Sequence, residues 1–290
     1  MQSTREIKER IKGISSIKQI TRAMEMVAAS RLKKVENRVV ASRTFTEKLH
    51  QMVSDLLSSL PEESSQRWFA KKEGENSVTK VILITADKGL CGAYNNNIIQ
   101  KTVRFIKESK KQVKLILIGK KANLYFSKRK DVYAIEEYIP ESVEKLGFEW
   151  VKSFAAKLTR DYNDQKYGEL HIFFTKFHTV MQSFPSSLRL FPIEKEGFGG
   201  EGREKREYII EPSVEDILNN LFPKYIETQI YQCILESLTS EYAARRVAMI
   251  AATENAGEMI DDLTSAYNKA RQETITKELL EIVSGAEALA

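Results

Sequence analysis

The chain has 290 residues, of which 42% are hydrophobic and 29% are charged, and its formal net charge is +5. This size accommodates one domain with a hydrophobic core together with extended elements. Cys91 and Cys233 are too far apart for a disulfide framework or a metal site and favour a reducing compartment, and the three histidines show no ligand spacing. No apolar run approaches the roughly 20 residues that cross a bilayer, so we expect any membrane association to depend on a partner.

The first 60 residues predict one long helix. Ser3 and Glu6 match a capping box, and no proline follows until Pro61. Hydrophobic residues recur at alternating steps of three and four, which is typical of a helix wound against another helix. A helix from about residue 4 to about 58 is on the order of 80 Å long, so we expect it to project from any compact domain. The stripe comprises Ile7, Ile11, Ile14, Ile17, Ile20, Met24 and Val27, and after a phase shift Ala28, Leu32, Val35, Val39, Ser42, Thr46, Leu49, Val53 and Leu56.

Positive charge is concentrated on this helix. Between Arg5 and Arg43 there are eleven basic and four acidic residues, an excess of seven positive charges. The excess predicts an acidic partner, which is a protein, a nucleic acid or an anionic lipid surface. Arg31, Lys33, Lys34 and Arg38 are compatible with phosphate contacts, with a solvated helix face and with an acidic protein. The apolar residues between them and the lack of a base-reading cluster argue against DNA.

The centre of the chain has the pattern of an α/β domain. Residues 61–77 are a polar connection, and strands are predicted at 80–85, 113–119, 132–139 and 170–177. Helical stretches at 96–107 and 142–162 lie between strands, which favours a small sheet with parallel pairs. The glycine-rich, charged residues 194–206 are most simply a mobile loop.

The turn from Thr85 to Asn95 follows the first strand and opens a helix. Helix N-termini bind phosphate, but this turn is not a G-x-G-x-x-G motif and lacks the Walker lysine. A tight turn that needs glycine is therefore the favoured interpretation. Asp87 is the best catalytic carboxylate here, yet it has no identifiable partner, and Cys91 is more simply a buried packing residue than a nucleophile. We predict no catalytic residue, no metal site and no cofactor.

The C-terminal region predicts a second long helix. Ser213 is a cap candidate, and Pro223 is expected to break or kink the helix early. From Lys224 to about Val283 there is no further proline, a span on the order of 90 Å. Glu273 and Lys277 occupy the expected core positions after Ala270, so we expect this end to leave its helical partner. The preceding seam comprises Met249, Ala252, Ala256, Met259, Leu263, Ala266 and Ala270.

These pieces predict an α/β protein in which a long antiparallel coiled coil of the N- and C-terminal helices accompanies a small Rossmann-like α/β sheet domain. Both helices return to the same domain, which makes them antiparallel, and the heptads predict a left-handed supercoil. The expected divisions are an N-terminal coiled-coil helix at 1–60, a foot domain at 78–211 and a C-terminal coiled-coil helix at 213–290.

Three segments closely resemble the gamma subunit of F-type ATP synthases. They are ITRAMEMVAASRLKK (20–34), DKGLCGAYN (87–95) and ATENAGEMIDDLTSAYNKARQETITKELLEIVSGAEAL (252–289). Lys88 and Ala93 depart from the Arg and Gly that are commoner in this family. Residues 120–200 match only in general pattern. A cysteine pair of the kind used for redox control in chloroplast gamma chains is absent, so that regulation is not implied.

The resemblance implies the central rotor stalk, which couples ion-driven rotation of the c-ring to conformational change at the catalytic beta subunits and has no active site of its own. Its implied partners are the alpha, beta and epsilon subunits and the membrane c-ring, with delta only indirectly, without nucleic acid or direct membrane insertion. The start at Met1 without a transit peptide favours a bacterial source. We expect a peripheral protein on the cytoplasmic face of the bacterial plasma (inner) membrane.

The resemblance also implies contact residues. The shaft contacts to the alpha/beta ring fall at Met24, Arg245, Arg271, Gln272 and Thr276. The foot contacts to the c-ring and epsilon fall at Tyr208 and Glu211, where the alternative is a simple edge strand, YIIEP. Two other functions stay open, a coiled-coil adaptor or nucleic-acid-binding protein that uses the basic N-terminal helix, and a nucleotide-using enzyme with helical arms.

Overall fold

The computed structural model describes residues 3–58, 78–193 and 213–287. The chain divides into two compact units. The two-helix unit comprises residues 1–29 and 245–290, and the sheet unit comprises residues 30–244. The long helices α1 (Thr4–Ser58) and α6 (Val214–Glu287) contribute to both units. The α/β fold with antiparallel terminal helices agrees with the prediction.

The described residues of the sheet unit form a sheet of five strands in the order β3-β2-β1-β4-β5. Strands β1 (Thr79–Ile84), β2 (Val113–Ile118), β3 (Ala134–Ile139) and β4 (Glu169–Phe177) are parallel and confirm the four predicted strands to within two residues. The last strand, β5 (Ser183–Phe191), pairs antiparallel with β4 and was not predicted. Its sequence, SFPSSLRLF, contains a proline and three serines, which are poor strand formers.

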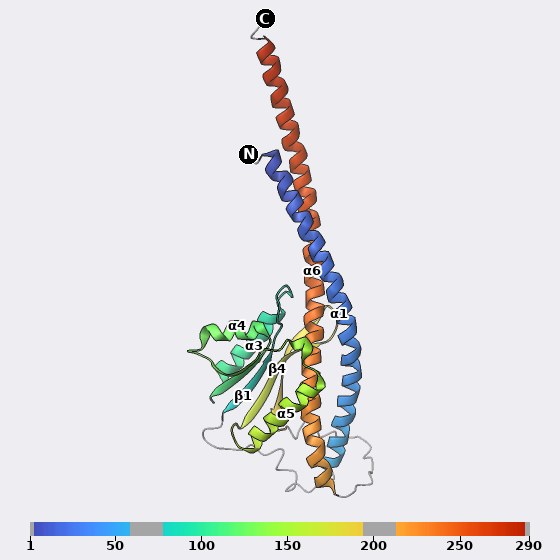
Figure 1. The fold of residues 1–290 in the computed structure, drawn as a ribbon, viewed down its shortest axis with the longest axis vertical. Coiled ribbons are helices and arrows are strands. Elements are labelled where there is room, and N and C mark those ends of the chain that lie inside the picture. Colours follow the sequence, from blue (N-terminus) through green and yellow to red (C-terminus); the bar gives the residue numbers. More distant parts are fainter. Residues whose placement is uncertain (1–2, 59–77, 194–212, 288–290) are drawn as a thin grey trace. The chain divides into compact units, whose positions relative to one another are not determined.

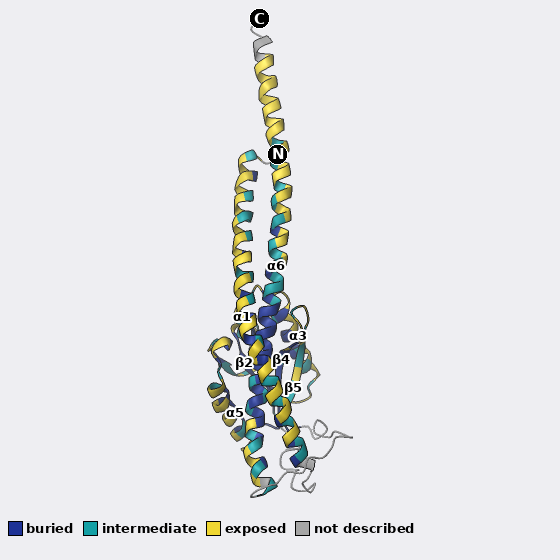
Figure 2. Ribbon diagram, turned by 90° about the vertical axis from the view of Figure 1, so that its right-hand side faces the viewer, coloured by how far each residue is buried: buried dark blue, intermediate teal, exposed yellow. Residues whose placement is uncertain are grey.

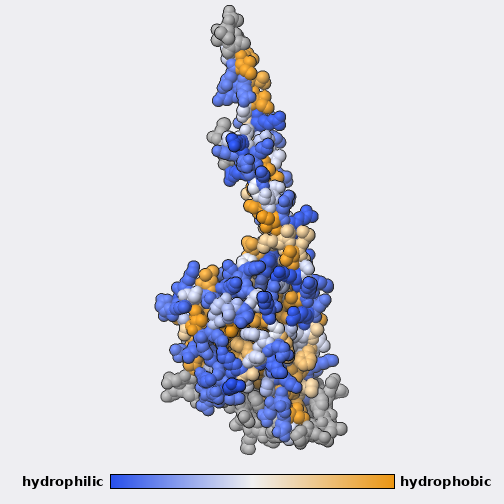
Figure 3. All heavy atoms as spheres, in the orientation of Figure 1, coloured by the Kyte–Doolittle hydropathy of each residue, from blue (hydrophilic) through white to orange (hydrophobic). Residues whose placement is uncertain are grey.

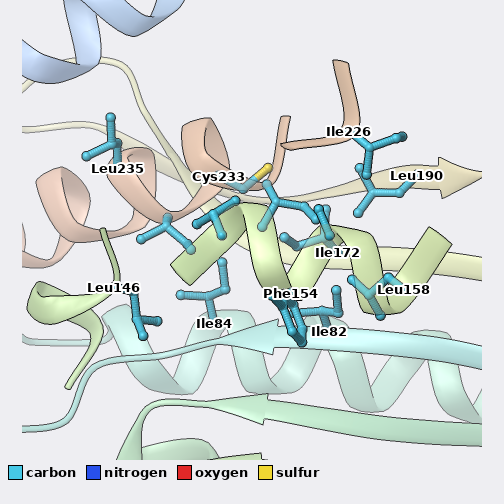
Figure 4. Close-up of a cluster of buried hydrophobic side chains, with 14 of the residues drawn as sticks. Ile82, Ile84, Leu146, Phe154, Leu158, Ile172, Leu190, Ile226, Cys233 and Leu235 are labelled. Carbon is cyan, nitrogen blue, oxygen red and sulfur yellow. The ribbon is translucent and has the colours of Figure 1, made fainter. Parts of the chain in front are cut away.

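Helices cover both faces of this sheet (Figure 1). On one face, side chains of β1 and β2 pack against α3 (Tyr94–Glu108) and α4 (Lys120–Phe126), with Val81, Ile98 and Phe126 fully buried. On the other face, the alternate strand residues pack against α5 (Phe148–Asn163) and the sheet-unit part of α6. Figure 4 shows this second core, where Ile82 and Ile84 of β1 face Phe154 and Leu158 of α5. The strands are buried on both faces, which explains their nearly continuous apolar sequence.

The helix boundaries follow the sequence signals with two corrections. Ser3 Oγ accepts from the Glu6 N–H at 3.3 Å while Glu6 accepts from the Ser3 N–H at 3.1 Å, which confirms the capping box. Ser213 caps α6 by accepting from the Asp216 N–H at 3.1 Å. Of the break or kink expected at Pro223, the break is wrong, because α6 continues through it and the neighbouring Phe222 and Ile226 are buried in the core. The helix expected at 142–162 begins only at Phe148, after a short 3-10 turn at Val143–Lys145.

A buried lysine organises the start of β1. Lys80 donates to Glu136 at 2.6 Å and to Asp161 at 3.4 Å, and Lys166 donates to Asp161 at 2.6 Å. Burial disfavours the charged carboxylate of Asp161, but the two lysines outweigh this effect and lower its pKa. The folded state therefore holds Asp161 ionised. Its pair with Lys80 joins α5 to β1, and the pair of Lys80 with Glu136 joins β1 to β3.

The substitution Asp161→Asn is expected to destabilise the sheet unit near neutral pH. Because the folded-state pKa is lowered, the carboxylate contributes stability above its unfolded pKa of about 3.9, and this contribution is lost as the pH falls through the folded pKa. Urea denaturation of wild type and variant across this range measures the difference, which is expected to shrink in acid. Asp164→Asn is the control, because its half-exposed carboxylate meets only Lys166, at 3.5 Å. Equal pH dependence of the three proteins would contradict the prediction.

The two-helix unit is antiparallel. Thr21 and Thr253 hydroxyls lie 2.7 Å apart, and the Lys18 ammonium lies against Gly257. The residue numbers of facing positions therefore add up to about 274 or 275, as an antiparallel register requires. Glycine at 257 leaves the space that the Lys18 side chain occupies, since a Cβ there would lie 3.1 Å from Nζ.

The hydrophobic stripe predicted to form the α1 interface is wrong in its middle. Ile17, Ile20 and Val27 are more than half exposed, whereas Thr21 and Ala28 are buried. The facing residues step from Ile14 through Lys18 and Thr21 to Ala28, so the isoleucines turn outward. Hydrophobicity misled the prediction because a threonine pair and a lysine over a glycine fill the interface instead.

The predicted seam of α6 is partly confirmed. Met249 and Ala256 are buried, and Ala252, Leu263 and Ala270 are half-buried. Met259 and Ala266 are exposed, and their neighbours Ile260 and Tyr267 are the less exposed residues. From Arg271 to Ser284 every residue is exposed, visible as the yellow end of α6 in Figure 2.

Several predictions lie outside the described residues. These are the polar connection 61–77, the loop 194–206, and Tyr208 and Glu211 with the edge strand proposed around them. Among the described helices, none has a stretch of the length and hydropathy that a bilayer crossing demands.

Candidate partner-binding surfaces

The glycine turn is a structural junction. The Asp87 carboxylate accepts from the Lys120 N–H at 3.1 Å, from the Ser142 hydroxyl at 2.8 Å and from the Val143 N–H at 3.2 Å. It therefore ties together the segments that follow β1, β2 and β3. This is the edge at which parallel sheets usually bind ligands, and here the chain's own carboxylate occupies the donors.

The other polar groups of the turn also bond within the sheet unit. Asn95 accepts from the Ala86 N–H at 2.9 Å and donates to the Cys91 sulfur at 3.2 Å. Cys91 is 1% exposed, as expected for a packing residue. The buried Tyr94 phenol donates to the Ser237 carbonyl of α6 at 3.0 Å. Asp87 and Cys91, the two candidates for chemistry, thus act in folding.

Neither the hollow beside α3 nor the acidic side chains of the described residues provide a reactive centre. A hollow of about 490 Å³ lies between α3 and β5, and its Lys101 ammonium donates to the Pro185 carbonyl at 2.8 Å. In the ranges 3–58, 78–193 and 213–287, no three histidine, cysteine or acidic side chains are arranged to hold a metal ion.

Half of the basic set on α1 is engaged within the sheet unit. Arg31 forms an ion pair with Glu144, which also accepts from the Tyr242 hydroxyl. Arg38 donates to the Tyr231 hydroxyl at 2.5 Å. Only Lys33 and Lys34 of the four remain as exposed side chains without such a contact among those described. A phosphate-gripping surface would thus lose two of its four cations to internal contacts.

The implied shaft residues lie at two separate positions along the two-helix unit. Met24 is half-buried on α1 and Arg245 is 9% exposed on α6. Arg271, Gln272 and Thr276 are exposed, and the Thr276 hydroxyl donates to the Gln272 carbonyl of its own helix at 2.9 Å. Arg245 and Arg271 are 26 residues apart in sequence, which corresponds to about 39 Å along a straight helix. The structure therefore does not gather the five residues into one site.

The antiparallel register explains why Arg271, Gln272 and Thr276 are not covered by α1. Because facing residue numbers add up to about 274 or 275, Arg271 is level with residues 3 and 4, where α1 begins. The sequence pattern predicts this exposure from Glu273 and Lys277, which occupy the expected core positions. The nearer cause is that α1 does not extend further to provide a partner.

Two exposed apolar rows were not predicted as surfaces. On α1, Ile17, Ile20 and Val27 share a face with Met24. On the free end of α6, hydrophobic side chains alternate with hydrophilic ones in the face shown in Figure 3. The exposed apolar residues of this end are Ile275, Leu279, Leu280, Ile282 and Val283. Exposed apolar side chains gathered on one helix in this way are typical of an interaction site.

Comparison with known proteins identifies relatives across the whole chain. A family model described as ATP synthase matches residues 3–289. The ATP synthase gamma chain of Christiangramia forsetii is 36% identical over 100% of this chain and 99% of that protein. The ATP synthase gamma chain of Alkaliphilus metalliredigens is 39% identical over 98% of both chains. No adaptor or nucleic-acid-binding protein is among these relatives.

Solved structures share the fold. A chain of the Euglena gracilis mitochondrial ATP synthase, in an OSCP/F1/c-ring structure, has a TM-score of 0.66 at 20% identity and covers 99% of this chain and 94% of its own. A chain of the Tetrahymena thermophila mitochondrial ATP synthase, from a structure of the central stalk and c-ring, has a TM-score of 0.60 at 24% identity. It covers 80% of this chain and 99% of its own.

Proposed function

This chain belongs to the family of ATP synthase gamma chains, and from this membership we propose how it works as the central rotor stalk of an F-type ATP synthase. The gamma chain is a non-catalytic subunit. It couples ion-driven rotation of the c-ring to conformational change at the catalytic beta subunits. The alternative of a nucleic-acid-binding adaptor has no support among the relatives.

The free end of α6 is the observation that supports the shaft role most directly. Beyond Ala270 it combines apolar side chains with Arg271, Gln272 and Thr276, all exposed. A helix that remains in water gains nothing from such side chains, whereas one enclosed by a ring of partner subunits buries them. Arg271 and Gln272 then supply directional contacts to the alpha/beta ring on this apolar surface.

The asymmetry of the shaft provides the coupling. Each orientation of the rotor changes the equilibrium of a catalytic site only by the difference in its affinity for two beta conformations. Met24 and the row Ile17, Ile20 and Val27 occupy one face of α1, so the surface differs around the shaft. Met24 and Arg245 form the second proposed contact with the ring.

The remaining assignments concern the foot and the location. We assign the foot to residues 78–211 between coiled-coil helices at 1–60 and 213–290, with Tyr208 and Glu211 as contacts to the c-ring and epsilon. The chain is part of a peripheral, membrane-associated complex. We place it on the cytoplasmic face of a bacterial inner membrane, because the relatives cited above are bacterial chains that match over 98–99% of their own length.

Reconstitution tests the function. Alpha and beta subunits are assembled with and without this chain, and ATP hydrolysis is measured together with the rotation of a probe on the sheet unit. The rotor role requires that hydrolysis depends on the chain and that the probe turns in one direction. Hydrolysis of equal rate without the chain would refute it.

The substitution Met24→Lys is expected to lower the number of protons pumped per ATP hydrolysed. It places a charge on the apolar face of α1 that is proposed to meet the beta subunits, where an unpaired charge is costly to bury. ATP-driven acidification of vesicles that carry the complete enzyme measures the ratio. Gln19→Lys is the control, since it adds the same charge at an exposed α1 position off the apolar row. An unchanged ratio in Met24→Lys would remove this residue from the contact.

A further inference from the structure

Strand β4 extends beyond its parallel neighbour. Its last pair with β1 is Phe173 with Leu83, while its pairing with β5 continues to Phe177 with Ser183. Among the described residues, those from Phe174 to Phe177 therefore have a strand on one side only. Buried backbone groups on the other side need partners, because an unpaired buried N–H or C=O is costly.

Pro185 shows which backbone groups lack a strand. It faces Thr175 in the antiparallel pair. Proline has no N–H, so it cannot exchange the two hydrogen bonds of a bonded antiparallel pair. The N–H and C=O of Thr175 therefore point away from β5, and by the two-residue period of a strand those of Phe177 do the same.

Side chains of the long helices meet all four of these groups. The Thr175 N–H donates to the Ser237 hydroxyl at 3.3 Å, and the Thr175 carbonyl accepts from the Ser240 hydroxyl at 3.1 Å. The Phe177 N–H donates to the Glu236 carboxylate at 2.8 Å, and its carbonyl accepts from the Arg43 guanidinium at 2.6 Å. The long helices thus take the place of a missing strand.

These side chains form a buried and interlocked set. Glu236, Ser237 and Ser240 are 3%, 1% and 0% exposed, and their spacing places them on one face of α6. Arg43 of α1 holds Glu236 by two parallel hydrogen bonds of 2.7 and 2.8 Å. Helix α6 is therefore bonded to Thr175 and Phe177, and α1 is bonded to Phe177 and, through Glu236, to α6.

Hydrogen bonds at this position resist rotation of α6 against the sheet. The apolar contacts of α6 with the sheet are non-directional, so they resist separation more than sliding or rolling. Hydrogen bonds weaken steeply when their angles change, so they oppose rotation of the helix against the sheet. The set is the place in the sheet unit where α6 meets the β4 backbone itself.

We propose that Arg43, Glu236, Ser237 and Ser240, bonded to Thr175 and Phe177, are the torque-bearing joint between the β-sheet and the long helices within the sheet unit. The proposal rests on the proposed rotor function. Torque applied to the sheet unit passes through this joint into α6, which continues into the two-helix unit.

The test measures torsional stiffness in the assembled complex. The shaft is locked by omitting nucleotide, and a bead is attached to the sheet unit through Lys107→Cys, an exposed position on α3, since both native cysteines are buried. The double variant Ser237→Ala/Ser240→Ala is expected to raise the variance of the bead angle by about twofold, because two of the four backbone groups lose their partners. A bead attached to α6 through Lys224→Cys is expected to show the wild-type variance.

A matched variant separates mechanics from folding. Thr239→Val removes a hydroxyl that is equally buried on the same helix but donates to Leu235 of its own helix at 2.8 Å. This variant is expected to leave the variance of the bead angle unchanged. The double variant Ser237→Thr/Ser240→Thr retains both hydroxyls, so its variance is expected to lie closer to that of wild type than the variance of the double alanine variant does. Equal variance in the double alanine variant and wild type would overturn the joint, as would an equal increase in Thr239→Val. Failure of the wild-type complex to rotate would instead refute the rotor function.

Discussion

Alanine at position 119 is expected to prevent the sheet unit from folding stably. Gly119 follows β2 with a φ of +95°, a conformation that L side chains rarely adopt. A Cβ there would lie 2.1 Å from the Thr85 carbonyl oxygen and 2.8 Å from the Thr85 hydroxyl. Backbone strain alone costs about 1–3 kcal/mol, and the steric overlap adds to it.

The overlap has no easy relief. Thr85 is 1% exposed, its N–H donates to the Ile118 carbonyl at 2.9 Å, and its hydroxyl accepts from the Ala122 N–H at 2.9 Å. Moving Thr85 would displace β1, in which Ile82 and Ile84 are fully buried. We therefore expect a loss of stability on the order of 4–5 kcal/mol, at the upper end for single substitutions.

Urea denaturation followed by circular dichroism, with assembly into the alpha/beta ring as a second readout, measures this loss. Two control glycines separate the effects. Gly92→Ala has a φ of +55° with no atom within 4 Å of the new Cβ, so only strain of about 1–2 kcal/mol is expected. Gly147→Ala has neither strain nor overlap, and because Gly147 is the N-cap of α5, a loss of only about 1 kcal/mol or less is expected. A Gly119→Ala protein as stable as Gly147→Ala would refute the steric argument.

The substitution Arg271→Glu is expected to reduce ATP hydrolysis by the reconstituted complex by about tenfold or more, because it opposes a charge pair at the proposed ring contact. The same change is expected to leave the stability of the free chain unaltered. Arg271 is exposed and lies level with the first residues of α1. Its side chain is therefore not packed between the two helices, and replacing it removes no such packing. Few substitutions on this chain separate folding from function as clearly.

The matched control is Lys269→Glu, which makes the same change of charge two residues earlier on the same exposed helix. Two residues correspond to about 200° around a helix, so this side chain points away from Arg271. Steady-state hydrolysis and thermal denaturation are measured for both variants. Equal hydrolysis in Arg271→Glu and wild type, or equal losses in the two variants, would exclude a specific contact at Arg271.

Periodicity predicted the elements of this fold but not all of its pairings. The four parallel strands and both long helices could be predicted because buried strands are continuously apolar and the hydrophobic residues of long paired helices repeat by heptads. The short helix α4 has too few residues for a periodic signal, and β5 is serine-rich with a proline, so neither was found. Their structure depends on neighbours distant in sequence.

The seam of the two-helix unit shows a different limit. Hydrophobicity placed Ile17 and Ile20 in the interface, yet Thr21 and Lys18 lie there. Threonine fits because it finds Thr253 across the interface, and lysine fits because residue 257 is glycine. Such complementarity involves two positions more than 230 residues apart, which a single sequence does not pair. The hydrophobic pattern alone does not distinguish exposed isoleucines such as these from core residues.

Pro185 also affects how the chain behaves before it meets its partners. Because Thr175 and Pro185 form a non-bonded pair, the backbone nitrogen of Pro185 faces the side of β5 away from β4. An incoming strand from another molecule would find no donor at this position and would meet a pyrrolidine ring. Natural sheets use proline at edges in this way to avoid pairing with other chains. Among the described strands β5 is the outermost on this side, so Pro185 removes one backbone donor from that edge and disfavours edge-to-edge pairing of newly made chains there.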